Sequence, residues 1–214
     1  KINIASTATN SIGVYVGNGS TGTGTGDITI DGNGNAGVAN FGTFNQTGGT
    51  IDVSGKDSIG IYAKDSSSST TITGSTVNAK NGAVAFYADG SSGNESTITL
   101  NNVTSNIGDG GLLFIGYTGT LPGQVGKFNI SGPTTVNILS GGVAFYNRGI
   151  IGSEATFLNM VNGNNLTLNM SSGSRLFVFD NPATTENLSS IPSLGGVSSI
   201  SNSSGTATIT VNGS

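Results

Sequence analysis

The sequence predicts an all-β fold: a parallel β-helix of about seven coils, each 23–33 residues long with three short strands. Two observations carry this prediction. A short apolar motif recurs along the chain, and a second apolar pair precedes it at a nearly constant distance. Turn-forming Gly and Asn separate these segments, whereas good helix formers are sparse and β-branched residues abundant.

The recurrent motif is clearest at 58–63, 83–88 and 142–147, which read SIGIYA, AVAFYA and GVAFYN. The first apolar residues of successive copies are 24, 23, 25, 28, 31 and 33 residues apart: Ile12, Ala36, Ile59, Val84, Leu112, Val143 and Leu176. Self-similarity at such a period is typical of repeat architectures. Since first and third strand positions share a face, we expect both to point inward. The third positions then form one internal column: Phe86, Phe114, Phe145 and Val178.

The second apolar pair lies seven to nine residues before each motif, which predicts two strands joined by a short turn on every coil. Its copies are 28–30, 51–53, 77–79, 136–138 and 168–170, with Val103 as a truncated copy. A third strand is expected further upstream, and its candidates are Phe41 with Phe44, 71–73, 98–100, 128–130, 157–160 and 209–211. Stacked coils bury continuous apolar columns, and the outward Thr, Ser, Asn and Asp can form hydrogen-bonded ladders. A β-sandwich, the rival fold, does not explain the repeated two-strand module.

The domain organisation expected is a single β-helix segment, 1–214, cut from a longer repeat protein, because the chain starts and stops within the pattern. Coil length grows toward the C-terminus, which predicts loop insertions at about 116–126, 148–165 and 181–205. Loops that lengthen on one side of a solenoid are frequent binding sites. The candidates for binding residues are therefore Tyr117, Arg148 and Tyr146. Tyr62, Tyr87 and Tyr146 are predicted to point outward, as an exposed stripe or beneath these loops.

Composition disfavours several functional classes. The net charge is −4 and the seven Lys and Arg are scattered singly, so no nucleic-acid partner is expected. No apolar run or basic amphipathic helix predicts membrane insertion of this segment. Cys and His are absent, which removes thiolate sites, the commonest metal ligand and the commonest general base. We therefore expect no cofactor and no metal.

The acidic residues are the candidates for a catalytic group. Polysaccharide-cleaving β-helices need two or three carboxylates close together, for acid–base chemistry or to hold calcium. Asp52 lies level with uncharged polar residues on both neighbouring coils. Asp65 and Asp89 lie on neighbouring coils, with Lys64 level with Asp89, and are expected to be a solvated surface pair. No catalytic residue is predicted.

Three stretches carry a family resemblance: the Gly-Ile-Tyr-Ala-like strands, Gly-Gly-Thr-Ile-Asp-Val at 48–53, and the segment 165–179. They resemble the passenger domains of type V autotransporter adhesins, especially the large outer-membrane autotransporters of fusobacteria. The resemblance covers essentially the whole chain and is one of repeat style. It implies a right-handed parallel β-helix, extracellular and displayed at the outer membrane of a Gram-negative bacterium, with a role in adhesion and virulence.

The function expected is thus a non-catalytic, structural β-helical stalk with an adhesin role. Its partner would be a protein or glycan receptor on host cells or other bacteria, and the segment is expected to be a monomer. The alternative is a carbohydrate-active β-helix enzyme, a lyase or hydrolase. A third hypothesis, an ice-binding solenoid, comes from the Thr-x-Thr triplets at 71–73 and 97–99.

Overall fold

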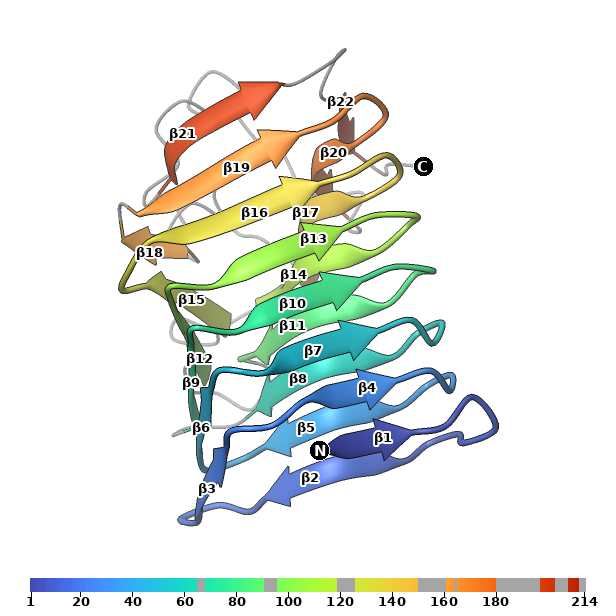
Figure 1. Cartoon of the computed structure of the whole chain (residues 1–214). Helices are drawn as coiled ribbons and strands as arrows, with labels where there is room; N and C mark the ends of the chain where they lie inside the picture. The colour runs from blue at the N-terminus through green and yellow to red at the C-terminus, as the bar shows by residue number, and fades with distance from the viewer. Residues whose placement is uncertain are drawn as a thin grey trace.

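The computed structural model describes residues 1–64, 68–90, 96–118, 126–149, 161–163, 165–179, 197–202 and 208–211. Within these residues the chain is all-β, and its parallel strands stack coil upon coil into a β-helix, which confirms the predicted fold class (Figure 1). Two of the three sheets each hold eight strands, one more than the seven coils expected. No helix in the described part of the chain is long and apolar enough to cross a membrane.

Each complete coil contributes one strand to each of three parallel sheets. Sheet A consists of β1 (Ile2–Ile4), β4 (Ile28–Ile30), β7 (Thr50–Val53), β10 (Thr76–Ala79), β13 (Thr104–Ile107), β16 (Thr134–Ile138), β19 (Leu166–Met170) and β21 (Val197–Asn202). Sheet B consists of β2 (Ile12–Val16), β5 (Ala36–Asn40), β8 (Ile59–Lys64), β11 (Val84–Asp89), β14 (Leu112–Thr118), β17 (Val143–Gly149), β20 (Arg175–Phe179) and β22 (Thr208–Val211). Sheet C consists of β3 (Thr21–Gly24), β6 (Thr43–Thr47), β9 (Ser69–Thr73), β12 (Ser96–Asn101), β15 (Gly126–Ile130) and β18 (Val161–Gly163).

Sheet A forms from the apolar pairs predicted at 28–30, 51–53, 77–79, 136–138 and 168–170. Its inward residues lie in register from coil to coil and are almost completely buried, as the alternation of apolar and polar residues predicts. One coil departs from the prediction. In β13 the inward positions are Ser105 and Ile107, whereas Val103 lies buried just before the strand. The Ser105 hydroxyl is fully buried and has no hydrogen-bond partner.

The prediction that the first and third motif positions share a face is wrong for sheet B. In β8 both Gly60 and Ile61 face the core: a Cβ on Gly60 would lie 3.1 Å from Val53 Cγ2 in sheet A. The register pairs Ile59 with Val84 and then Ile61 with Phe86, passing over the residue between. Because two successive residues turn inward, the alternation breaks there. The first position therefore lies on the outer face with the fourth, where it lines a shallow groove.

The internal aromatic column is confirmed for three of its four predicted members. The ring centroids of Phe86 and Phe114 lie 5.8 Å apart, and those of Phe114 and Phe145 lie 5.5 Å apart. The fourth assignment was wrong by one residue, because Phe177 is the register partner of Phe145 and Val178 pairs with Tyr146. The last copy of the motif thus begins at Arg175, not at Leu176. Because this outward position is occupied by a charged residue, Arg175, the apolar pattern of the sequence did not identify it as the start of the motif.

Sheet C contains the strands predicted at 71–73, 98–100 and 128–130, and Phe44 is buried in β6. Phe41 does not belong to this sheet. It follows β5, and its ring contacts the rings of Tyr15 and Tyr62. The segment 209–211 lies in sheet B as part of β22, so its assignment to the third sheet was wrong. The candidate at 157–160 lies outside the described residues.

Described strands lie within or run into all three of the expected insertions. Strand β14 extends to Thr118 and β17 to Gly149, so both run into the ranges 116–126 and 148–165. Strand β18 lies within the second of these ranges, and β21 lies within 181–205. Serine-rich and Gly-containing strands lack the apolar alternation on which the prediction depended. The coils therefore continue through segments that read as loops.

Candidate binding surfaces

The structure places the three candidates for binding residues within strands, whereas the sequence predicted them in or beside loops. Tyr117 near the end of β14 is the register partner of Arg148 in β17, and Tyr146 is the partner of Ile115. Tyr146 is half-buried and lines a groove of about 310 Å³ on the outer face of sheet B. First-position residues of the motif, including Ile59 and Leu112, line the same groove.

An aromatic stripe, formed by Tyr15, Phe41, Tyr62 and Tyr87, runs along the outer face of sheet B beside this groove. Neighbouring ring centroids lie 5.4, 6.3 and 5.2 Å apart. The prediction that Tyr62 and Tyr87 point outward is confirmed, but both rings are half-buried because they pack against each other. Only Tyr15, at the N-terminal end, is largely exposed, at 64%.

Asp89 is buried, so the expected solvated surface pair was wrong for this residue. Its side chain is 8% exposed and accepts a hydrogen bond of 2.8 Å from the Tyr62 hydroxyl. Lys64, level with Asp89 as predicted, places its Nζ 3.8 Å from the same carboxylate oxygen. Asp65 lies outside the described residues. Asp89 therefore ties neighbouring strands of sheet B together beneath the stripe.

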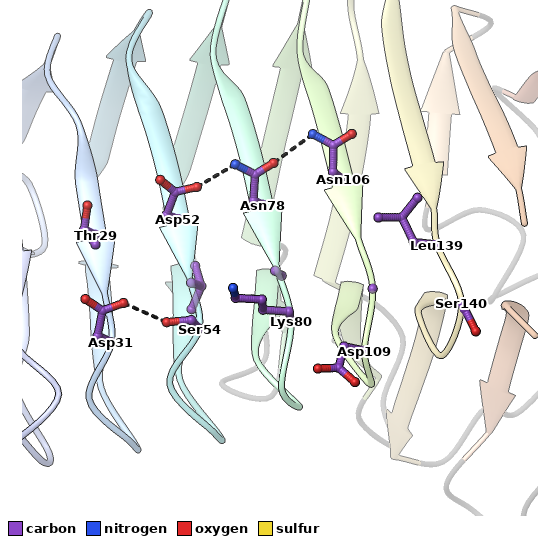
Figure 2. Close-up of a pocket in the computed structure, with 13 residues that line it drawn as sticks. Thr29, Asp31, Asp52, Ser54, Asn78, Lys80, Asn106, Asp109, Leu139 and Ser140 are labelled. Carbon is purple, nitrogen blue, oxygen red and sulfur yellow. Dashed lines mark hydrogen bonds between the residues drawn. The ribbon is translucent and has the colours of Figure 1, made fainter.

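A second hollow, the sheet A groove, has a volume of about 730 Å³ and crosses the outer face of sheet A (Figure 2). Outward side chains of successive coils form its floor in two rows. One row follows the strand centres, and its members are Thr29, Asp52, Asn78 and Asn106. The other row follows the strand ends, and its members are Asp31, Ser54, Lys80, Gly108 and Leu139. The sequence predicted polar residues on the outer face of sheet A, but it did not predict a hollow there.

The central row is joined by a ladder of side-chain hydrogen bonds, as outward Asn and Asp were expected to form. Asn78 Nδ2 donates to Asp52 Oδ1 over 2.5 Å, and Asn106 Nδ2 donates to Asn78 Oδ1 over 2.8 Å (Figure 2). Two further bonds of 2.9 Å continue the ladder through Asn137 to Asn169. The ladder fixes the orientation of each amide, so the groove floor is pre-organised.

The hollow itself arises where the second row lacks a side chain. Gly108 lies between Lys80 and Leu139 in this row, and a Cβ built on it would lie only 3.1 Å from Leu139 Cβ. Leu139 is 46% exposed and directly follows β16, the strand next to that of Asn106 (Figure 2). The signal for the hollow is the glycine at 108 beside the leucine at 139. It can be recognised only when the register of the neighbouring coils is known.

The charged groups of the groove are Asp31, Asp52, Asp109 and Lys80. Asp31 accepts a hydrogen bond of 2.7 Å from Ser54 Oγ, and Asp52 accepts the bond from Asn78. Among the described residues, no three Asp, Glu, His or Cys side chains lie close enough together to hold a metal ion. The groove offers fixed donors, fixed acceptors and one apolar contact, which are the means of reversible binding.

No protein-family model, no curated protein and no solved structure matches this chain.

Proposed function

We propose that this chain is a non-catalytic, structural and adhesive segment of a cell-surface autotransporter passenger, displayed outside a Gram-negative bacterium. The observation that carries the proposal is the continuous stack of coils, whose inner faces form one core and whose outer faces present the sheet A groove and the aromatic stripe. A rod of this kind holds binding surfaces away from the surface to which it is attached.

The charged side chains of the groove favour binding over catalysis. A glycan-cleaving site needs two carboxylates poised on either side of one bond, or several around a calcium ion. Here Asp31 accepts a hydrogen bond from Ser54, and Asp52 accepts one from Asn78 at the end of the ladder. These bonds keep the carboxylates in the floor of the groove.

The adhesive role is tested by incubating the fluorescently labelled chain with cultured host cells and with other bacterial species. We expect saturable binding that excess unlabelled chain displaces. Heat-unfolded chain serves as the control for non-specific attachment. Absence of saturable binding to every surface would contradict the adhesive role and leave the role of a spacer.

The non-catalytic role is tested separately by incubating the folded chain with acidic polysaccharides. We expect no increase in reducing ends and no unsaturated products. Turnover that disappears on unfolding the chain would contradict the proposal in favour of a lyase or hydrolase.

A further inference from the structure

We infer that the sheet A groove binds an uncharged, hydroxyl-rich glycan chain and rejects acidic polysaccharides. This inference names the ligand class for the adhesive role and therefore rests on the proposed function. Four properties of the groove lead to it: the free hydrogen-bonding capacity of its amides, its single apolar contact, its charge and its length.

The amides of the ladder keep half of their hydrogen-bonding capacity. Asn78 and Asn106 each donate one N–H to the preceding coil and accept one bond from the next. Each therefore keeps a second N–H and a second lone pair for a ligand. A sugar hydroxyl both donates and accepts, so it matches a floor on which donors and acceptors repeat about every 4.8 Å.

Leu139 supplies an apolar contact within this polar surface. It is one of three large apolar residues exposed in the described part of the chain, with Ile12 and Tyr15. The notch at Gly108 leaves the space beside Leu139 open. A pyranose ring has an apolar C–H face and a polar rim, so one ring can contact Leu139 while its hydroxyls reach the amides.

The charge of the groove determines which glycans it accepts. Three carboxylates, Asp31, Asp52 and Asp109, face a single ammonium, that of Lys80, which leaves the groove net negative. The whole chain is also negative, at −4. A uronate or sulfated chain would be repelled along the length of the groove, whereas a neutral chain carries no charge for these carboxylates to repel.

The dimensions of the groove favour a chain of several sugars over a single ring. Its lining residues come from coils at β4, β7, β10, β13 and β16. Five strands at about 4.8 Å spacing extend over roughly 19 Å along the rod. A linear oligosaccharide lying along the ladder would therefore contact several coils at once.

The test is titration calorimetry of the chain with three neutral probes and two acidic ones. The neutral probes are cellotetraose, chitotetraose and mannotetraose, and the acidic ones are tetragalacturonate and a heparin tetrasaccharide. We expect at least one neutral probe to bind with a dissociation constant in the millimolar range or below, and neither acidic probe to bind. Binding of an acidic probe equal to that of the neutral ones would overturn the inference, as would failure of every neutral probe.

Variants assign the binding to the groove. Leu139→Ala should weaken binding of the probe about tenfold, because it removes the apolar contact. Leu139→Asp should abolish binding, because it places a hydrated carboxylate where the apolar face of the sugar ring would lie. Ile12→Ala, at an equally exposed apolar residue on sheet B, should change nothing. Lys80→Glu removes the N–H donors of the groove's ammonium and should weaken binding, whereas Lys56→Glu makes the same change outside the groove and should not. Binding insensitive to Leu139→Asp would place the ligand elsewhere and overturn the inference.

The two proposals can fail independently. Saturable cell binding that neither a neutral probe nor Leu139→Asp reduces would refute the glycan groove, leave the adhesive role standing and indicate a protein receptor. Glycan binding that Leu139→Asp abolishes, without attachment to any cell, would support the groove and refute the adhesive role.

Discussion

Asn78 and Asn106 belong to a ladder in which every amide donates to the coil before it, toward Asp52. The ladder ends on a carboxylate, so its final bond is charge-assisted and is the shortest of the four, at 2.5 Å. A side chain in this row thus has a donor on one side and an acceptor on the other. Changing one atom of one amide should disturb the row without removing volume.

The isosteric substitution Asn78→Asp tests this directly. It replaces a donor by a carboxylate next to Asp52, so the like charges raise the folded-state pKa of the carboxyl pair in the variant above its unfolded value. The folded state then binds more protons, and the destabilisation is present at neutral pH and relieved as the pH falls. We expect the free energy of unfolding to drop by about 2 kcal/mol at pH 7 and to recover most of this at about pH 3.

The control for this experiment is Asn137→Asp. Its ladder neighbours are Asn106 and Asn169, so the new charge meets no carboxylate in its row. Denaturant unfolding at several pH values should show little pH dependence of its effect relative to the wild-type chain. An equal pH dependence in both variants would contradict the explanation by paired carboxylates.

At the scale of the element, β13 is the strand of sheet A whose inward residues the sequence did not predict. Its inward position holds Ser105 between Val77 and Val136 of the neighbouring coils. The Ser105 hydroxyl is completely buried and lacks a hydrogen-bond partner, which costs free energy in the folded state. An aliphatic residue at this position would continue the Val column.

Ser105→Val should therefore stabilise the chain, by about 1 kcal/mol in denaturant unfolding. The gain comes from removing an unsatisfied polar group and filling the column with the side chain that both neighbours carry. Ser105→Ala separates the two contributions, because it removes the hydroxyl without adding volume. A loss of stability in both variants would show that the hydroxyl has a function in the core.

The elements also show which features of the fold can be predicted from the sequence and which cannot. The pairs of sheet A could be predicted because each has a strict apolar–polar–apolar pattern, as in Ile51-Asp52-Val53. The orientation of the first position in sheet B could not, because Gly60 has no side chain to reveal that it faces inward. The residue types predicted that outward Asn and Asp would form a hydrogen-bonded ladder. The groove could not be predicted in this way, because it depends on Gly108 and Leu139 lying side by side on neighbouring coils.

At the scale of the molecule, the rod is quasi-one-dimensional. Strands β1 and β2 each have one neighbour, whereas β10 and β11 are paired on both sides. Each coil is therefore stabilised mainly by the coils that it contacts, and the described N-terminal coil has a single such contact. Stability should accordingly vary along the rod.

Hydrogen exchange measures this variation directly. We expect amides of β10 and β11 to exchange about a hundredfold more slowly than those of β1 and β2, because the end coil can open without disrupting its neighbours. Amides of β4 and β5 should exchange at intermediate rates. Uniform protection across all these strands would contradict this expectation and indicate all-or-none opening of the rod.

The parallel register described above also has a mechanical consequence. The backbone hydrogen bonds between coils run along the rod, so tension applied to its two ends falls first on the bonds that hold an end coil to the next. Each coil of 23–33 residues that unwinds would release roughly 80–110 Å of extended chain, against the ~4.8 Å that it occupied in the stack. Under tension the rod would therefore lengthen in steps, and each step would dissipate force.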